Sequence, residues 1–400
     1  MPWSLRIILI LAGLSVICML YTGSRLFWSY KVLFFQNITF FQVVTAATGF
    51  LFLIYPLSGF IQYLISGTFS QNNYPKLLIY LFWYGFIFSA VMVSWTLFLD
   101  LASAGFRYGL KVNAPELDAL LSRMMIGITV LMLVYTGIKT IWHSNKIAVK
   151  QVTYPLNTLP QEEIEPLKIV HISDLHADRF TTPSKINGYI DKVNHQKPDI
   201  IFFTGDLITA GVHYIEEGAA ALGRLDARLG TYAVMGDHDY WAGESLIKEA
   251  LEKWGVKVLG NESHEIQNGN NRIQVTGVTE LYSKKLIPNE LENLMENSQN
   301  SQNSQNSHLN IVFSHQATAR IIELAKKNGY QLVLGGHTHG GQIRIPFFFY
   351  PVTLARLETK YVKGKKWFNQ LLLNINSGLG YTLAPVRYGA PAQISVIKVE

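Results

Sequence analysis

The sequence has almost no cysteine, and its first part has almost no acid. Cys18 is the single cysteine among 400 residues and lies inside an apolar run. One chain can therefore build neither a disulfide framework nor a cysteine-based zinc site, which fits a reducing compartment. Residues 1–150 hold ten basic and three acidic residues, a net charge of +7, whereas residues 151–400 hold 24 basic and 25 acidic residues, a net charge of −1. A second part without excess positive charge argues against a nucleic-acid partner.

Charge is also missing from long stretches of the first 145 residues. Residues 7–21, 32–75 and 77–99 contain no charged side chain, and residues 124–137 form a fourth apolar run. Because about 20 apolar residues cross a bilayer, we predict an all-α bundle of four transmembrane helices over residues 1–145. A cleaved signal peptide is the alternative for the first run, but three further spans follow and no small-residue cleavage site is evident.

Basic residues give only one indication of the orientation in the bilayer. With four spans, five Lys or Arg residues fall on each side of the membrane. Lys139, Lys146 and Lys150 cluster at the end of the last span, and the positive-inside rule then favours a cytoplasmic C-terminal domain.

After residue 145 the sequence changes from long apolar runs to a polar stretch followed by short alternating elements. Residues 146–166 are polar, contain three prolines in "QVTYPLNTLPQEEIEP", and are predicted to be a linker. From residue 167 onward, short apolar strands such as "LKIVHIS", "DIIFFTG" and "LNIVFSH" alternate with helical stretches, which is typical of an α/β domain over residues 167–400. The repeat "NSQNSQNSQNS" at residues 297–307 lacks core-forming residues and predicts a disordered polar loop.

Aspartates and histidines follow directly after several of the predicted strands. They are Asp174, His176 and Asp178, then Asp206, then Asp237, His238 and Asp239, then His315, and finally His337 and His339. Since ligands bind at the carboxyl ends of strands in open α/β sheets, these side chains should converge. The D-x-H and H-x-H pairs point to one face of an extended backbone. Carboxylates and imidazoles without thiolates suit Zn, Mn or Fe, and about seven candidate ligands among these ten residues are too many for one tetrahedral ion and suit two.

The motifs "DLH" (174–176), "GD" (205–206), "GDHD" (236–239), "SH" (314–315) and "GGHTHGGQ" (335–342) occur in that order. Together they resemble the five blocks of the calcineurin-like metallophosphoesterases. "KIVHISDLH", "GGHTHGGQIRIP" and "SGLGYTLAPVRYGAP" are similar to the bacterial membrane-associated branch, which includes UDP-diacylglucosamine hydrolases. The resemblance covers about residues 165–400 and implies a four-layer α/β (α+β) sandwich. It also implies a location in the bacterial inner (plasma) membrane.

The resemblance also implies a role for each matching position. One metal would be held by Asp174, His176 and His339, the second by Asp237, His315 and His337, and both by Asp206. His238 would protonate the leaving oxygen or stabilise the phosphoryl charge, with Asp239 as the group that orients it. Asp178 and Asp239 could also be plain surface residues, and His171, inside a strand, is expected to be a packed histidine.

Position 237 departs from the family pattern, which usually has Asn. Asp can still ligate a metal, so the site should survive the change. The added negative charge should weaken the attraction of an anionic substrate, hold the second metal more tightly and raise the pKa of a bridging water.

These features predict a membrane-anchored phosphoric ester hydrolase with two divalent ions (Mn, Zn or Fe). A metal-bridging hydroxide would attack a phosphoester or pyrophosphate. Because four spans tether the domain, we expect a phosphorylated substrate at the bilayer, such as a phospholipid or nucleotide-linked lipid. The alternatives are a non-catalytic metal-binding membrane scaffold and a nucleotide phosphodiesterase, for which a basic groove is not evident.

Three further features keep two interpretations each. The run "PFFFYP" (346–351) is either a buried strand or a membrane-facing lip that admits a lipid-like substrate. Arg344 and Arg387 are either phosphate contacts or surface charges.

Overall fold

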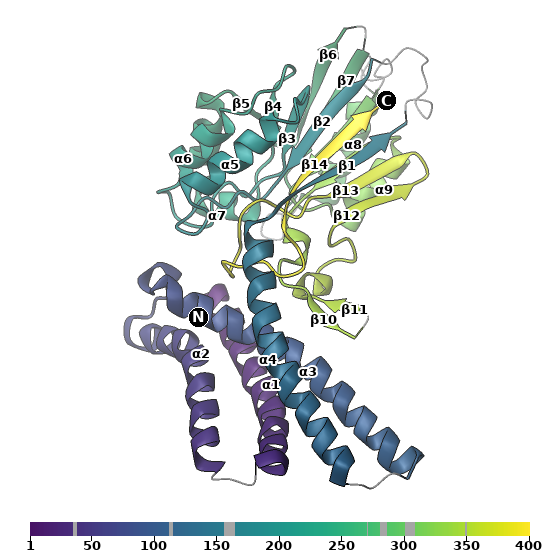
Figure 1. Cartoon of the computed structure of the whole chain (residues 1–400). Helices are drawn as coiled ribbons and strands as arrows, with labels where there is room; N and C mark the ends of the chain where they lie inside the picture. Colours follow the sequence, from purple (N-terminus) through teal and green to yellow (C-terminus); the bar gives the residue numbers. More distant parts are fainter. Residues whose placement is uncertain are drawn as a thin grey trace. The chain divides into compact units, whose positions relative to one another are not determined.

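The computed structural model describes residues 1–34, 38–111, 115–155, 165–269, 271–280, 286–300, 309–348 and 350–400. The chain forms two compact units (Figure 1). The first unit contains Met1–Ser144, Ile343–Thr353 and Leu383–Gly389. The second contains Asn145–Gln342, Leu354–Thr382 and Ala390–Glu400.

Four long helices build the first unit. They are α1 (Trp3–Phe34), α2 (Ile38–Ser66), α3 (Lys76–Ala104) and α4 (Pro115–Asn145), with a 3-10 turn at Gln71–Asn73 and a π-helical segment, η2, at Gly105–Gly109. Each of the four is long and apolar enough to cross a membrane. The prediction of four long apolar helices before the α/β domain is therefore confirmed.

Two segments from the C-terminal half of the sequence pack within this helical unit. The first carries a hairpin of β10 (Ile345–Phe347) and β11 (Tyr350–Val352), and Ser94 Oγ of α3 donates to the carbonyl of Pro346 at 3.2 Å. In the second segment, the backbone N–H of Gly389 donates to His143 Nδ1 at 2.9 Å. The aromatic run is thus a hairpin with exposed rings rather than a buried strand, since Phe347 is 40% and Tyr350 55% exposed.

The second unit contains two six-stranded sheets (Figure 1). The first sheet has the order β1-β14-β2-β3-β4-β5, with β1 at Ile147–Tyr154, β2 at Leu167–Ile172, β3 at Ile200–Phe203, β4 at Thr231–Ala233, β5 at Val256–Val258 and β14 at Ala392–Val399. The second has the order β12-β13-β9-β8-β7-β6, with β6 at Glu262–Asn268, β7 at Asn271–Val278, β8 at Leu309–Ser314, β9 at Leu332–Gly335, β12 at Gly364–Phe368 and β13 at Leu371–Ile375.

Three apolar clusters show how the layers pack. Helices α5 (Pro183–Asn194), α6 (Ile215–Leu222) and α7 (Asp237–Lys253) pack on one face of the first sheet. The other face meets the second sheet, where Phe202 of β3 contacts Phe313 of β8 with ring centroids 4.9 Å apart. Helices α8 (Pro288–Asn300) and α9 (Ala319–Lys327) cover the far face of the second sheet. The result is the predicted four-layer α/β sandwich.

Two predicted boundaries are wrong. Within the expected linker 146–166, residues Ile147–Tyr154 form β1, which pairs in parallel with β14 from Ile147↔Ala392 to Tyr154↔Val399. Its pairing partner lies about 245 residues away along the chain, so no local pattern announces this strand. Within the expected loop 297–307, residues 297–300 complete α8, and residues 301–307 lie outside the described part.

His171 is packed inside the sandwich, as its place in a strand suggests. Asn374 Nδ2 donates to its Nδ1 at 2.8 Å, and its Nε2 lies 2.9 Å from Thr204 Oγ1. Burial lowers the pKa of His171 to about 3, so the ring is neutral and structural near neutral pH.

Candidate metal centre

The site residues sit on strained backbone at the strand ends. Five non-glycine residues have positive φ there: Asp174 (52°), His176 (45°), Asp206 (60°), His337 (67°) and His339 (50°). The left-handed region costs a non-glycine residue of the order of 1 kcal/mol or more, and such strain gathers at functional sites. The loops after β2, β3 and β9 therefore turn sharply, which places side chains from three strands at one edge.

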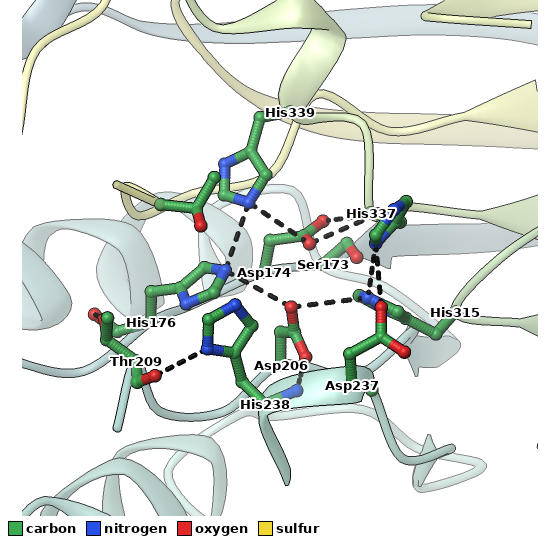
Figure 2. A network of polar contacts seen from close by, with 12 residues as sticks. Ser173, Asp174, His176, Asp206, Thr209, Asp237, His238, His315, His337 and His339 are labelled. Atoms are coloured by element: carbon green, nitrogen blue, oxygen red, sulfur yellow. Dashed lines mark hydrogen bonds and ion pairs between the residues drawn. The ribbon is translucent and has the colours of Figure 1, made fainter. Parts of the chain in front are cut away.

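One cluster combines the D-x-H motif after β2 with the second histidine of the H-x-H motif. His176 Nε2 lies 3.1 Å from His339 Nε2, and His339 Nε2 lies 3.4 Å from Asp174 Oδ1 (Figure 2). All three side chains are buried. Asp174, His176 and His339 can hold one metal ion together, as the resemblance implies.

A second cluster combines residues that follow β4, β8 and β9. His337 Nδ1 lies 3.3 Å from Asp237 Oδ2 and 3.2 Å from His315 Nε2. The loops bring these three side chains close enough to share one metal ion. The His315 ring is fixed from behind, because its Nδ1–H donates to the carbonyl of Thr204 at 2.7 Å.

Asp206 lies between the two clusters. Its Oδ2 is 3.3 Å from His176 Nε2 and 3.3 Å from His315 Nε2, so one carboxylate faces both groups (Figure 2). Burial by itself would raise the pKa of Asp206, but the charge of His315 and the hydrogen bonds from His176 and His315 hold it well below its usual range. The carboxylate is therefore ionised, as a ligand shared by two cations must be.

The residues fit a pair of divalent ions by their donor chemistry. Asp237 Oδ1 is buried and has no hydrogen-bond partner among the described residues, although a buried carboxylate oxygen normally has one. The Nε2 atoms of His176 and His339 converge to 3.1 Å, as two imidazole ligands of one cation would. A cation among these atoms would satisfy both features.

His238 follows Asp237 at the start of α7 and faces the first cluster. Its Nδ1 lies 2.5 Å from the carbonyl of Thr209, so Nδ1 carries the proton and Nε2 is left as an acceptor. Its ring lies 4.7 Å from that of His176, centroid to centroid. Burial lowers the pKa of His238 to about 4, which keeps the free ring neutral near pH 7.

Asp239 does not orient the His238 ring, contrary to the sequence prediction. The carboxylate instead accepts backbone N–H groups: Oδ2 from Asp206 at 2.8 Å and Gly236 at 2.9 Å, and Oδ1 from Leu207 at 2.8 Å. Asp239 is also buried rather than a surface residue. Its function in the structure is to join the loop after β3, which carries Asp206, to the loop after β4.

We expect Asp239→Asn to weaken metal binding about 10- to 100-fold, as losses of outer hydrogen bonds at metal sites do. An amide NH₂ must face at least one backbone N–H that the carboxylate now accepts, so the Asp206 loop would shift. Metal content of the purified full chain during dialysis against a graded chelator measures this. Asp191→Asn on the exposed surface of α5 is the matched control, and equal metal retention in the two variants would contradict the role.

Three supporting residues were not singled out from the sequence. Gln316 Nε2 donates to Asp237 Oδ2 at 2.6 Å, Glu358 Oε2 lies 3.2 Å from His337 Nε2, and the Thr209 carbonyl holds His238. Gln316 directly follows the ligand His315, which is the only sequence signal for it. The Thr209 carbonyl belongs to the backbone, and Glu358 lies 21 residues from His337, so the sequence gives no such signal for either of them.

Asp178 lies beside the cluster and shapes its loop. Its Oδ1 accepts the backbone N–H groups of Phe180 and Thr181 at 2.7 Å each, and its Oδ2 accepts Thr209 Oγ1 at 3.0 Å.

Of the two arginines that were either phosphate contacts or surface charges, Arg387 is fully buried, which excludes the surface-charge interpretation for it.

Comparison with known proteins identifies the family of the domain that carries these clusters. Residues 167–341 match the calcineurin-like phosphoesterase family. Residues 167–341 therefore form a calcineurin-like metallophosphoesterase domain, a class of metal-dependent phosphoric ester hydrolases.

Relatives of the whole chain are distant. An uncharacterized metallophosphoesterase of Helicobacter pylori strain J99 is 25% identical over 302 residues, which cover 73% of this chain and 76% of that protein. A bovine transmembrane protein with metallophosphoesterase domain is 26% identical over 62% of this chain and 56% of its own length. Phosphodiesterase YaeI of Escherichia coli is 27% identical over 60% of this chain and 84% of its own length.

The match spans less than two thirds of some of these relatives, including a second H. pylori protein matched over 63% of its length. The four apolar helices and the relatives named as transmembrane proteins mark the chain as a membrane protein.

Proposed function

We propose that the protein hydrolyses a phosphoester at two divalent ions, held by Asp174, His176 and His339 on one side and by Asp237, His315 and His337 on the other, with Asp206 shared. The observation that carries the proposal is the position of Asp206 Oδ2, 3.3 Å from an imidazole of each cluster. Two bound ions would neutralise the phosphoryl charge and supply an activated water. A non-catalytic scaffold would not need a shared ligand on strained backbone.

His238 handles the proton of the reaction in this proposal. Its Nε2 is the free nitrogen of the ring, because Nδ1–H is engaged by the Thr209 carbonyl. Burial keeps this ring neutral in the free enzyme, and an anionic phosphoryl group beside Nε2 would raise its pKa again. The ring could then carry a proton and pass it to the leaving oxygen.

In this proposal Asp237 is a functional metal ligand, and its difference from the usual Asn does not mark the site as non-catalytic. Its Oδ2 accepts from Gln316 Nε2, while Oδ1 is left for a cation. Gln316 is an amide, so it can turn by 180° and accept from an Asn at position 237 instead of donating to Asp.

We therefore expect Asp237→Asn to keep both metals and to hydrolyse substrate at least as fast as the original chain. The change removes one negative charge where an anionic substrate approaches. Steady-state kinetics with parallel metal analysis measures this. Complete loss of activity with metals still bound would show that the two residues are not interchangeable here.

We further propose that the substrate is lipid-linked. The segment Ile343–Thr353 follows the metal loop directly in sequence and packs in the same compact unit as the four apolar helices. Its hairpin exposes Phe347, Phe348 and Tyr350, which suits a membrane interface. The name of the relative YaeI supports a diester as the bond that is cleaved.

Hydrolysis of p-nitrophenyl phosphate and bis-p-nitrophenyl phosphate with Mn²⁺ tests the activity and the preference for mono- or diesters. The full chain in detergent is the right sample, because a fragment beginning at residue 151 would cut β1 in half. Turnover of either compound, abolished by chelation, is the expected result. Metal-loaded protein that cleaves neither, and releases neither a phosphomonoester nor free phosphate from phospholipids in mixed micelles, would favour the scaffold.

A further inference from the structure

The helical unit contains a pocket of about 350 Å³ that the phosphoesterase site does not explain. Its walls come from α1, α3, η2 and α4. Two arginines and one aspartate line it, Arg25, Arg107 and Asp100, together with the aromatic residues Trp28 and Tyr108. We call it the arginine pocket.

The charges in the arginine pocket are partly paired. Arg25 Nε and Nη2 each lie 3.1 Å from Asp100 Oδ2, and Tyr21 Oη donates to the same oxygen at 2.8 Å. Three donor groups thus contact the carboxylate of Asp100, the acidic residue that lines the pocket. Arg107 bonds Ser103 Oγ through Nε and Asp118 through Nη2.

Each guanidinium keeps a donor for a ligand. A guanidinium has five N–H groups, and the contacts above use only Nε and Nη2 of each arginine. Within the described part of the chain, Nη1 of Arg25 and Nη1 of Arg107 remain for an anion. Two arginine Nη1 groups on one pocket can bind a phosphate through charge-assisted hydrogen bonds.

The arginine pocket lies at one end of the bundle. Arg107 belongs to η2 at the end of α3, and Leu121 belongs to the second turn of α4. Leu121 precedes Asn145, the last residue of α4, by 24 residues, a rise of about 36 Å along a helix. This exceeds the roughly 30 Å hydrocarbon core. Arg25, Asp100 and Arg107 follow closely after the charge-free runs 7–21 and 77–99, so in a bilayer the pocket would lie at head-group level, which Trp28 and Tyr108 suit.

The backbone of the pocket wall is irregular. Gly105–Gly109 forms a π-helical turn, and π-helical turns inside or at the end of α-helices are rare and occur frequently at functional sites. This turn carries Arg107 and Tyr108, the two pocket residues contributed by η2.

We propose that the arginine pocket binds the head group of an anionic phospholipid, with its phosphate between Arg25 and Arg107. A lipid fits better than a soluble anion, because apolar residues (Leu99, Leu121 and Met125) line the same pocket and would meet the glycerol and upper acyl carbons. The assignment is independent of the phosphoesterase activity, since it concerns residues of the helical unit alone.

The test uses the full chain in mild detergent, with native mass spectrometry after addition of dioleoyl phosphatidylglycerol or dioleoyl phosphatidylcholine. Arg107→Gln removes one guanidinium, and Ala104→Leu fills the pocket without changing charge. We expect each to reduce bound phosphatidylglycerol about tenfold, because Arg107→Gln removes about one charge-assisted hydrogen bond and Ala104→Leu occupies space that the head group needs. Ala102→Leu on the same helix and Arg123→Gln on α4 lie outside the pocket lining and should bind as the original chain does.

Three results would overturn the proposal. One is unchanged phosphatidylglycerol binding in whichever of Arg107→Gln and Ala104→Leu elutes as a monodisperse particle. Another is an equal loss of phosphatidylcholine, which would mean a general lipid contact. The third is displacement of the lipid by excess inorganic phosphate, which would assign the pocket to a soluble anion. Because the two variants differ in charge and size, one that elutes as a monodisperse particle is enough to decide.

Discussion

Asp206→Asn is expected to lower kcat/KM by about 10³-fold, the loss expected when several kcal/mol of charge stabilisation by the ions disappears. The shared oxygen Oδ2 faces imidazoles of both clusters at 3.3 Å, so a neutral amide there weakens both sites at once. Oδ1 also accepts the backbone N–H of His238 at 2.9 Å, which an amide oxygen can still do. Fold and size are therefore preserved while the charge is lost.

Metal analysis separates this explanation from a folding defect. We expect the Asp206→Asn chain to retain at most one ion per molecule and an unaltered thermal transition after metal removal from both proteins. The matched control is again Asp191→Asn, which removes one exposed carboxylate from α5. A variant that keeps two tightly bound ions and full activity would show that Asp206 is not shared.

His238→Gln is expected to reduce kcat about 10²- to 10⁴-fold while both ions stay bound, which is the usual contribution of a positioned acid or base. A glutamine can keep a hydrogen bond to the Thr209 carbonyl but cannot carry the proton. The loss should be larger for alkyl phosphoesters than for p-nitrophenyl esters, because p-nitrophenolate leaves without protonation.

The comparison of leaving groups is the decisive measurement for His238. A ligand role would lower metal content and affect both substrate types equally, whereas a proton-transfer role changes their ratio and leaves the metal content alone. His195→Gln, an exposed histidine after α5, controls for the loss of an imidazole. An unchanged ratio with fewer bound ions would reassign His238 to the metal set of His176 and Asp206.

Several candidate site residues could be predicted because the signal for each of them lies in the neighbouring residues of the sequence. Asp174, His176, Asp206, His337 and His339 each follow a buried apolar strand within a few residues, and the strand ends necessarily meet. The role of Asp239 could not be predicted in this way. Its three backbone donors come from two different loops, and its distance from the His238 ring depends on how α7 begins.

Gln316 illustrates the same limit at position 237. The sequence shows an Asp where the family usually has Asn, and charge arguments alone make it a disturbance. The structure adds a buried amide that donates to Asp237 Oδ2 at 2.6 Å and can also serve an Asn. Whether position 237 accepts both Asp and Asn thus depends on Gln316, which follows β8 and is not part of the local motif around Asp237.

By itself the sequence determined four apolar helices and an α/β domain and predicted a two-metal ligand set, because hydrophobic length, periodicity and ligand type are local properties. Only the tertiary structure decided that Ile147–Tyr154 is an edge strand, that Asp206 Oδ2 lies 3.3 Å from an imidazole of each cluster, and that Thr209 holds His238. It also decided that Arg25 and Arg107 line one pocket. These features depend on pairings across long sequence separations, whose energies no local pattern of residues records.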